Sequence, residues 1–173
     1  MSDDNLVWCL KQKRGIRIIE PNANLSNAYM KKAISALNTM TAALKINETD
    51  WILTTAYYAR YFALYSLLMK IGIKSEIHDC TITLAKLLSN NGILTDSLSE
   101  DIAKAKQTRI DTQYYVEKEQ NPKTIKRQVE AARQFVLETE KAIENLTTEQ
   151  IINIRTKLTN SKKHHNTCLK STT

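Results

Sequence analysis

The sequence predicts an all-α protein, an antiparallel up-and-down helical bundle of four main helices plus accessory helices. The chain has only three glycines and two prolines among 173 residues, and 42% of its residues are hydrophobic. Such a composition contains few residues that interrupt helices and enough apolar residues for one core. Apolar residues also recur at alternating steps of three and four, the spacing of a helix face. The connections between these segments are short, which favours antiparallel neighbours.

The segment 51–69 is the most informative, because it is largely apolar and carries one charge, Arg60. Two series of side chains follow helical spacing, and the second continues beyond this segment to Ile71. These are Trp51, Thr55, Tyr58, Phe62, Tyr65 and Met69, and Leu53, Tyr57, Arg60, Leu64, Leu67 and Ile71. A helix with two such faces is buried nearly all round, so it is the predicted central helix. Its arginine, hydroxyls and tyrosines make it too polar for a lipid-facing span.

The first three helices are predicted in order from caps and periodicity. Asn24 or Ser26 caps a helix that continues to about Ile46 through the apolar series Met30, Ala33, Leu37, Met40 and Leu44. The central helix starts after Asn47 and ends at Gly72. Ser75 caps a third helix with the series Ile77, Thr81, Leu84 and Leu88, which closes at Asn90, Asn91 and Gly92.

The remaining helices follow from the same signals. Thr95 or Ser97 opens a fourth helix that runs through Arg109 towards Tyr115. The Asn121–Pro122 pair begins a fifth, whose apolar series is the longest: Ile125, Val129, Ala132, Val136, Thr139, Ile143 and Leu146. Thr147 and Gln150 form a capping box for a short sixth helix.

These elements divide the chain into four parts. Residues 1–20 are a basic N-terminal arm, expected to be extended and packed on the bundle. Residues 21–146 form the bundle, and 147–159 form a short accessory helix. Residues 160–173 are rich in Ser, Thr, Asn, Lys and His and are expected to be a basic, disordered tail.

The positive charge is uneven along the chain. The formal net charge is +7, of which residues 151–173 carry +5, residues 1–20 carry +1 and residues 21–150 carry +1. A basic terminal segment either adds salt-sensitive affinity for phosphates or serves as a solvated end.

Standard enzyme and metal motifs are not found in the sequence. It contains no glycine-rich phosphate loop and no G-x-S-x-G turn. Cys9, Cys80 and Cys168 are scattered and odd in number, so neither a disulfide framework nor a zinc site is indicated. We expect no metal and no cofactor. The acidic N-terminus lacks the layout of a signal peptide, which predicts a cytoplasmic protein without membrane association.

Four polar features are candidates for a site. Arg60 needs a partner in the core, either a structural ion pair or an anionic ligand. His78 lies near a helix start, where it either binds an anion or has a plain surface role. Arg109 with Tyr114 could hold a phosphate or stack a base, and Tyr57 and Tyr61 belong to a cluster with Tyr58 and Tyr65. Core packing is the alternative for the tyrosines.

The segment Ala56–Ala63, followed by Leu67, Leu68, Gly72, Lys74 and His78, resembles the second-helix region of small HEPN-domain proteins. HEPN denotes higher eukaryote and prokaryote nucleotide-binding. Further likeness lies in Arg109 with Tyr114, in Ala131, Ala132 and Phe135, and in the lead-in Lys11–Ile16, Glu20–Asn22, Leu25, Tyr29 and Ala33, which is similar to archaeal members. The resemblance covers about residues 8–146.

The resemblance implies an antiparallel helical bundle that commonly forms a homodimer, often beside a minimal nucleotidyltransferase partner. The better-studied members are ribonucleases, often toxins of toxin–antitoxin pairs, with an Arg and a His separated by four to six residues. Here seventeen residues separate Arg60 from His78, and the recognised pair is absent.

The leading hypothesis is therefore a module that binds a nucleotide, RNA or a nucleotidyltransferase partner without catalysis. Its expected ligand-binding residues are Arg60, His78, Arg109, Tyr57, Tyr61 and Tyr114. The alternative is a divergent metal-independent ribonuclease, in which His78, Arg60 and Arg109 are brought together by the fold.

Overall fold

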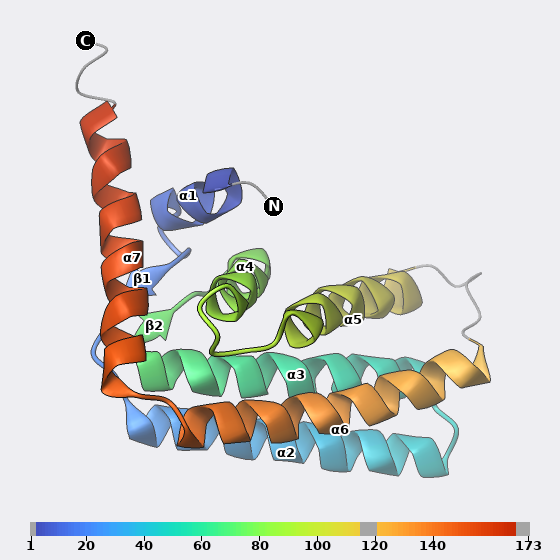
Figure 1. Ribbon diagram of the computed structural model, residues 1–173. Helices are drawn as coiled ribbons and strands as arrows, with labels where there is room; N and C mark the ends of the chain where they lie inside the picture. The colour runs from blue at the N-terminus through green and yellow to red at the C-terminus, as the bar shows by residue number, and fades with distance from the viewer. Residues whose placement is uncertain (1–2, 115–120, 169–173) are drawn as a thin grey trace.

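The protein is an all-α helical bundle, as the computed structural model shows for residues 3–114 and 121–168 (Figure 1). Its elements are α1 (Asp3–Lys11), β1 (Arg17–Ile18), α2 (Ala23–Lys45), α3 (Thr49–Ile71), β2 (Ile73–Lys74), α4 (His78–Ser89), α5 (Asp96–Tyr114), α6 (Pro122–Glu144) and α7 (Thr148–Cys168). The bundle helices α2, α3, α5 and α6 alternate in direction, which is the predicted up-and-down arrangement.

Helix α3 is the centre of the bundle. It contacts α2, α5 and α6, and its side chains are buried on nearly every side, as the two apolar series predict. The exception is its first turn, where Trp51 is 60% exposed. The helix ends at Gly72, whose φ of 82° is in the left-handed region that favours glycine.

Several helix starts follow the expected capping chemistry. The side chain of Asn121 accepts a hydrogen bond from the Lys123 amide at the start of α6, and Thr147 and Gln150 exchange bonds ahead of α7. Helix α2 is capped by Asn22, which accepts from the Leu25 amide, in place of Asn24 or Ser26. Ser75 does not cap α4.

The N-terminal arm is not extended, because Asp3–Lys11 is helical. Asp4 near its start and Lys11 in its last turn suit the helix dipole. Leu10 and Cys9 lie on the side that packs on the bundle, and both are buried. A short helix with one apolar stripe gives a weak periodic signal, and the basic residues that follow obscure it.

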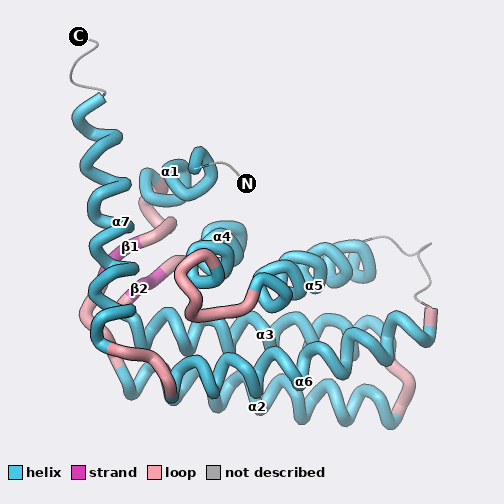
Figure 2. Tube along the Cα trace, viewed as in Figure 1, coloured by secondary structure: helices cyan, strands magenta, loops and turns pink. Residues whose placement is uncertain are grey.

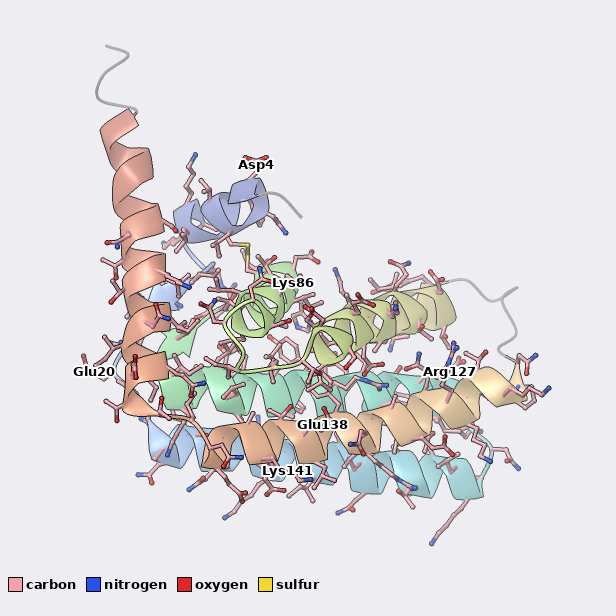
Figure 3. The ribbon with its side chains drawn as sticks, in the orientation of Figure 1. Asp4, Glu20, Lys86, Arg127, Glu138 and Lys141 are labelled. Atoms are coloured by element: carbon pink, nitrogen blue, oxygen red, sulfur yellow. A yellow bond between two sulfur atoms is a disulfide. The ribbon has the colours of Figure 1, made fainter. Side chains whose placement is uncertain are left out.

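A disulfide joins α1 to α4, contrary to the expectation from the cysteine spacing. Cys9 and Cys80 are 71 positions apart in sequence, and their Cα atoms lie 5.5 Å apart. Figure 3 shows the sulfur–sulfur bond between the two helices. Packing of α1 on α4 creates this proximity, so no local spacing of cysteines could reveal it.

The C-terminal helix is longer than predicted. Helix α7 continues to Cys168, so residues 160–168 of the expected disordered tail are helical, and 169–173 lie outside the described residues. No glycine or proline follows Thr147 to stop the helix. Ile154 and Leu158 are buried, and Arg155 Nη1 donates to the carbonyls of Ile19 (2.6 Å), Gly72 (3.1 Å) and Ile71 (3.2 Å).

A small antiparallel sheet links the N-terminal arm to the end of α3. Arg17 pairs with Lys74 and Ile18 with Ile73 (Figure 2, magenta). Glu76 lies beside this sheet and forms ion pairs with Arg14 (2.7 Å), Arg17 (2.6 Å) and Lys74 (3.0 Å). These cations, Arg14 foremost, lower the pKa of Glu76 to about 2.

No helix in the described part of the chain combines the length and apolar character that a bilayer crossing requires.

Candidate functional site

Three tyrosines of α3 form one wall of the candidate site. Residues 57 and 61 are one helical turn apart and 58 is adjacent, so they lie on neighbouring faces. Tyr57 is fully buried, Tyr61 is 8% exposed and Tyr58 is half-buried. The Tyr57 ring centroid lies 5.5 Å from that of Tyr58 and 6.0 Å from that of Tyr61. The rings form a continuous aromatic surface beneath α4 and α5.

His78 lies against this surface as the first residue of α4. Its ring stacks on Tyr61, with centroids 4.2 Å apart and an interplanar angle of 9°. Its Nδ1 lies 2.7 Å from the Tyr57 hydroxyl, a hydrogen bond whose direction depends on the tautomer. Burial lowers the pKa of His78, and the charges of Arg109 and Lys106 lower it further, against the opposite effect of Asp79. His78 is therefore mainly neutral at pH 7.

Arg109 reaches the same tyrosines from α5. Its guanidinium carbon lies 5.4 Å from the Tyr57 ring centroid and 5.9 Å from that of Tyr58. Its Nη1 donates to Gln113 Oε1 at 2.8 Å, and Gln113 in turn donates to Thr54 at 3.1 Å. Arg109 Nε is buried and has no hydrogen-bond partner among the residues described. The guanidinium group is thus oriented by its neighbours but incompletely satisfied.

Two further charged residues complete the surroundings. Lys106, one turn before Arg109 on α5, donates to the carboxylate of Asp79, which follows His78 on α4. The sequence-based prediction did not include these two residues. Their positions beside His78 and Arg109 were the available signal, since Lys106 and Arg109 are three residues apart on a helix. The pair connects α4 to α5 and places a second cation near the imidazole.

We call Tyr57, Tyr58, Tyr61, His78 and Arg109 the tyrosine–histidine–arginine cluster. Burial raises the pKa of Tyr57 and of Tyr61, so both hydroxyls stay protonated near neutral pH. The cluster therefore presents hydroxyls, a neutral imidazole and a guanidinium charge against aromatic faces.

Arg60 does not belong to this cluster. Its side chain is fully buried and donates to both oxygens of Asp101, at 2.6 and 3.3 Å. It also donates to the carbonyl of Ala56 (3.0 Å) and to the backbone and side-chain oxygens of Gln128 (3.1 and 3.0 Å). This is the structural ion pair that the sequence left as one of two alternatives, and each guanidinium nitrogen already has an oxygen partner within the core.

Tyr114 lies apart as well. It is the last described residue of α5 and is 71% exposed, while the neighbouring Tyr115 lies outside the described residues. Of the six residues expected to bind a ligand, the structure brings together Tyr57, Tyr61, His78 and Arg109.

The described residues offer no group of three His, Cys, Asp or Glu side chains that could hold a metal ion. The chemistry available in the cluster is anion recognition and proton transfer. A guanidinium stacked on tyrosine faces directs its N–H groups to the side, where those not used by Gln113 can meet phosphate or carboxylate oxygens.

Comparison with known protein families supplies one match. The model of the HEPN domain matches residues 26–143, a range that includes α3, α4, α5 and nearly all of α2 and α6. No curated protein matches the chain. All five residues of the tyrosine–histidine–arginine cluster lie within the matched range, whereas α1, β1 and the whole of α7 lie outside it. Because the match covers well over half of the sequence, the chain belongs to the HEPN domain family.

Proposed function

We propose that the protein is a HEPN module that binds a phosphate-bearing ligand, a nucleotide or RNA, at the tyrosine–histidine–arginine cluster. The observation that carries this proposal is the state of Arg109. Its guanidinium is held over Tyr57 and Tyr58, and its buried Nε has no partner among described residues. A buried donor without a partner costs free energy, which a ligand oxygen would recover on binding if the groups that cover Nε move aside.

The surrounding groups suit such a ligand. The Arg109 guanidinium supplies a fixed charge, and Lys106 supplies a second cation that is shared with Asp79. Tyr58 is the half-buried ring of the three and offers a face on which a base can stack, whereas Tyr57 is fully buried and His78 covers Tyr61. The contrast with Arg60 supports this assignment, because the Arg60 donors are already used within the core.

Thermal unfolding of the full chain with ATP and, separately, with a short single-stranded RNA tests the proposal. A ligand that binds the native state raises the unfolding temperature by mass action. We expect a rise for the wild-type protein that Arg109→Ala abolishes. Arg127→Ala is the matched control, because it removes one positive charge from an exposed position on α6. An equal rise in Arg109→Ala and wild type would refute binding at the cluster.

RNA cleavage is a second candidate, favoured by the proximity of His78 and Arg109. Both contact Tyr57, His78 through its hydroxyl and Arg109 through its ring face. A neutral imidazole can accept the proton of a 2′-hydroxyl while a guanidinium stabilises charge on the adjacent phosphate.

An assay with labelled RNA in the presence of EDTA tests this second function. If the cluster is catalytic, cleavage is lost in both His78→Ala and Arg109→Ala and retained in Arg127→Ala. Cleavage that survives His78→Ala would exclude His78 as the catalytic base. Ligand-induced stabilisation without any cleavage in the wild type would leave binding as the function of the cluster.

A further inference from the structure

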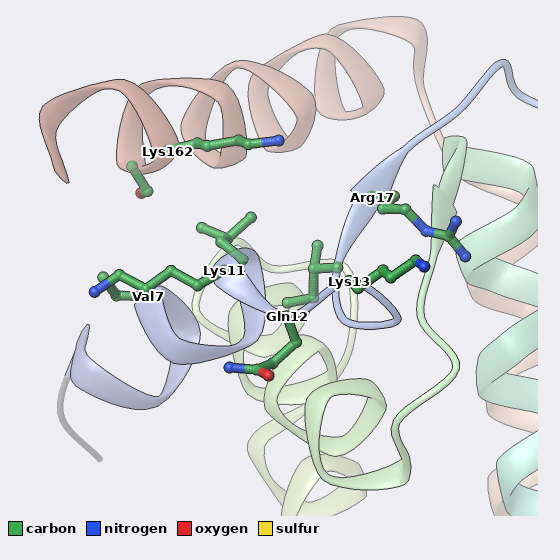
Figure 4. A pocket seen from close by; sticks show the side chains of 9 residues that line it. Val7, Lys11, Gln12, Lys13, Arg17 and Lys162 are labelled. Carbon is green, nitrogen blue, oxygen red and sulfur yellow. The ribbon is translucent and has the colours of Figure 1, made fainter. Parts of the chain in front are cut away.

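A second positively charged feature lies outside the matched family range, between α1 and α7. It is a cavity of about 420 Å³, which we call the α1–α7 cavity. Its lining consists of Val7, Leu10, Lys11, Gln12, Lys13, Ile16, Arg17, Ser161 and Lys162. Figure 4 shows Lys162 coming from α7 on one side and Lys11, Gln12 and Lys13 from the N-terminal segment on the other. The volume falls within the range of small-molecule sites.

The charges of the lining are of one sign. Four of the nine residues are Lys or Arg, and none is acidic. Arg17 is already paired with Glu76 at 2.6 Å, whereas Lys11, Lys13 and Lys162 form no ion pair with a described residue. Cationic side chains that line one cavity make its potential positive, which attracts an anion. The fold thus unites the two basic ends of the sequence.

The walls of the cavity are held in place by contacts that do not involve its lysines. Helix α1 is fixed by the Cys9–Cys80 disulfide, by Asn5 donating to Thr83 at 2.9 Å, and by the Ile16 amide donating to the Cys9 carbonyl at 2.9 Å. Helix α7 is fixed by Arg155 and its three carbonyl partners. Because these contacts hold the backbone in place, ligand binding has to order only the exposed lysine side chains.

The apolar part of the lining narrows the ligand class. Leu10 and Ile16 are buried and Val7 is half-buried, so one side of the cavity is apolar while its rim is cationic. Compact ammonium groups attract phosphate as point charges, and an apolar surface accepts the flat face of a base. We infer that the α1–α7 cavity binds the phosphate of a nucleotide, free or within an RNA strand, through Lys11, Lys13 and Lys162.

This inference does not depend on the function proposed for the tyrosine–histidine–arginine cluster, and one titration separates them. Fluorescence anisotropy of a labelled single-stranded RNA of about eight nucleotides measures binding to the full chain. The test protein is the triple variant Lys11→Ala, Lys13→Ala, Lys162→Ala. The matched control is Lys31→Ala, Lys45→Ala, Lys123→Ala, which removes three exposed lysines from α2 and α6. All six positions are exposed, so both variants are expected to fold, and circular dichroism verifies this.

We expect the cavity variant to raise the Kd at least about tenfold and to reduce the salt slope by about 2, since each phosphate contact on a single strand contributes about 0.7. The control variant raises the Kd by less than about threefold, an effect of net charge alone. Equal losses in the two triple variants, or no loss in the cavity variant, would overturn the inference.

Competition identifies the source of the phosphate. If ATP displaces the RNA, the cavity recognises a single nucleotide, whether that nucleotide is free or part of an RNA strand. Lysine-dependent RNA binding that ATP does not displace assigns it to the polymer. Displacement by a poly-glutamate peptide as effective as by ATP would overturn the phosphate assignment in favour of an acidic protein segment. Arg109→Ala in the same titration reports on the cluster separately, because the α1–α7 cavity contains no part of α5.

Discussion

Arg60 and Arg109 are two arginines of one bundle with opposite environments. Arg60 is fully buried on α3, and its guanidinium is paired with Asp101, Gln128 and a carbonyl of its own helix. Arg109 is half-buried on α5, lies over two tyrosine rings, and has one buried nitrogen without a described partner. The first environment gives every guanidinium nitrogen a hydrogen-bond partner. The second orients the guanidinium but leaves one nitrogen without a described partner.

The difference teaches how to separate a charge that the fold has fully paired from one that is a candidate for ligand binding. Arg60 was the natural first candidate, because an arginine in an apolar helix demands a partner. The fold supplies that partner internally, which uses the charge for the packing of α3, α5 and α6. Removing a partner from Arg60 should therefore affect folding, whereas changing Arg109 should affect binding.

Asp101→Ala should give the largest loss of stability. It leaves the buried Arg60 guanidinium without its counter-ion, and the expected cost is about 3 kcal/mol of unfolding free energy, the low end for broken buried pairs because Asp101 is 24% exposed. Urea unfolding measures it. Glu100→Ala is the control, since its pair with Lys104 is exposed and should contribute less than about 0.5 kcal/mol. Similar values for the two variants would contradict a structural role for Arg60.

Gln128→Ala should have an intermediate effect. Arg60 Nη2 loses the side-chain oxygen at 3.0 Å but keeps the Gln128 carbonyl and Asp101. We expect a cost of about 1.5 kcal/mol, the low end for one hydrogen bond to a charged group. The same urea titration on Gln134→Ala, an exposed glutamine of the same helix that bonds to Glu138, provides the baseline. A cost above that of Asp101→Ala would mean that Gln128 is the main partner.

Arg109→Ala should change stability by no more than about 1 kcal/mol, the scale of one cation–π contact. The loss should instead appear in ligand-induced stabilisation by ATP or RNA. The unfolding free energy and the ligand-induced stabilisation should both be measured for each variant. Asp101→Ala retains the tyrosine–histidine–arginine cluster, so it should lose stability but keep the ligand-induced stabilisation. A stability loss as large as that of Asp101→Ala would show that Arg109 is also a structural arginine.

The smallest effect concerns the protonation of His78. Its pKa is lowered in the folded state, by burial first and by Arg109 next. The unfolded chain therefore binds a proton more readily, and stability should rise with pH between the folded pKa and about 6.5, then stay constant. His78→Gln should remove this rise in unfolding temperatures measured from pH 5 to pH 8.

The same titration can distinguish the two arginines. Arg109→Gln should move the pKa of His78 back towards its ordinary value, as followed by NMR of the imidazole. Asp101→Ala, which disturbs only the Arg60 pair, should leave that pKa where it is in the wild type. A shift in the second variant and none in the first would reverse the assignment of the two charges.

Much of the bundle could be predicted because its signals are local. The apolar series of α2, α3 and α6, the stop at Gly72 and the capping box of Thr147 and Gln150 are all contained within single segments. Features whose sequence signals are weak or depend on distant residues were not predicted. Helix α1 has a short apolar stripe, the continuation of α7 to Cys168 has only helix propensity to indicate it, and the Cys9–Cys80 contact depends on tertiary packing.

For the candidate site too, the local features could be predicted and the features that depend on tertiary packing could not. Tyr57, Tyr61, His78 and Arg109 were identifiable as residue types, and they lie together. Their geometry depends on how α4 and α5 cross α3, which no local pattern specifies. The identity of the Arg60 partner was inaccessible for the same reason, since Asp101 is 41 positions away. Sequence could state that a partner was required but could not choose between a carboxylate and a ligand.

The Cys9–Cys80 bond has a consequence for the unfolded protein. It closes residues 9–80 into a covalent ring that contains all of α2 and α3, while α5, α6 and α7 lie on a linear tail. With the sulfurs reduced, the unfolded chain is fully linear and has more conformations to occupy. The free energy of unfolding is then the difference between the folded protein and a more disordered unfolded chain, so it is smaller. The stability of the protein therefore depends on the redox state of the compartment in which it folds.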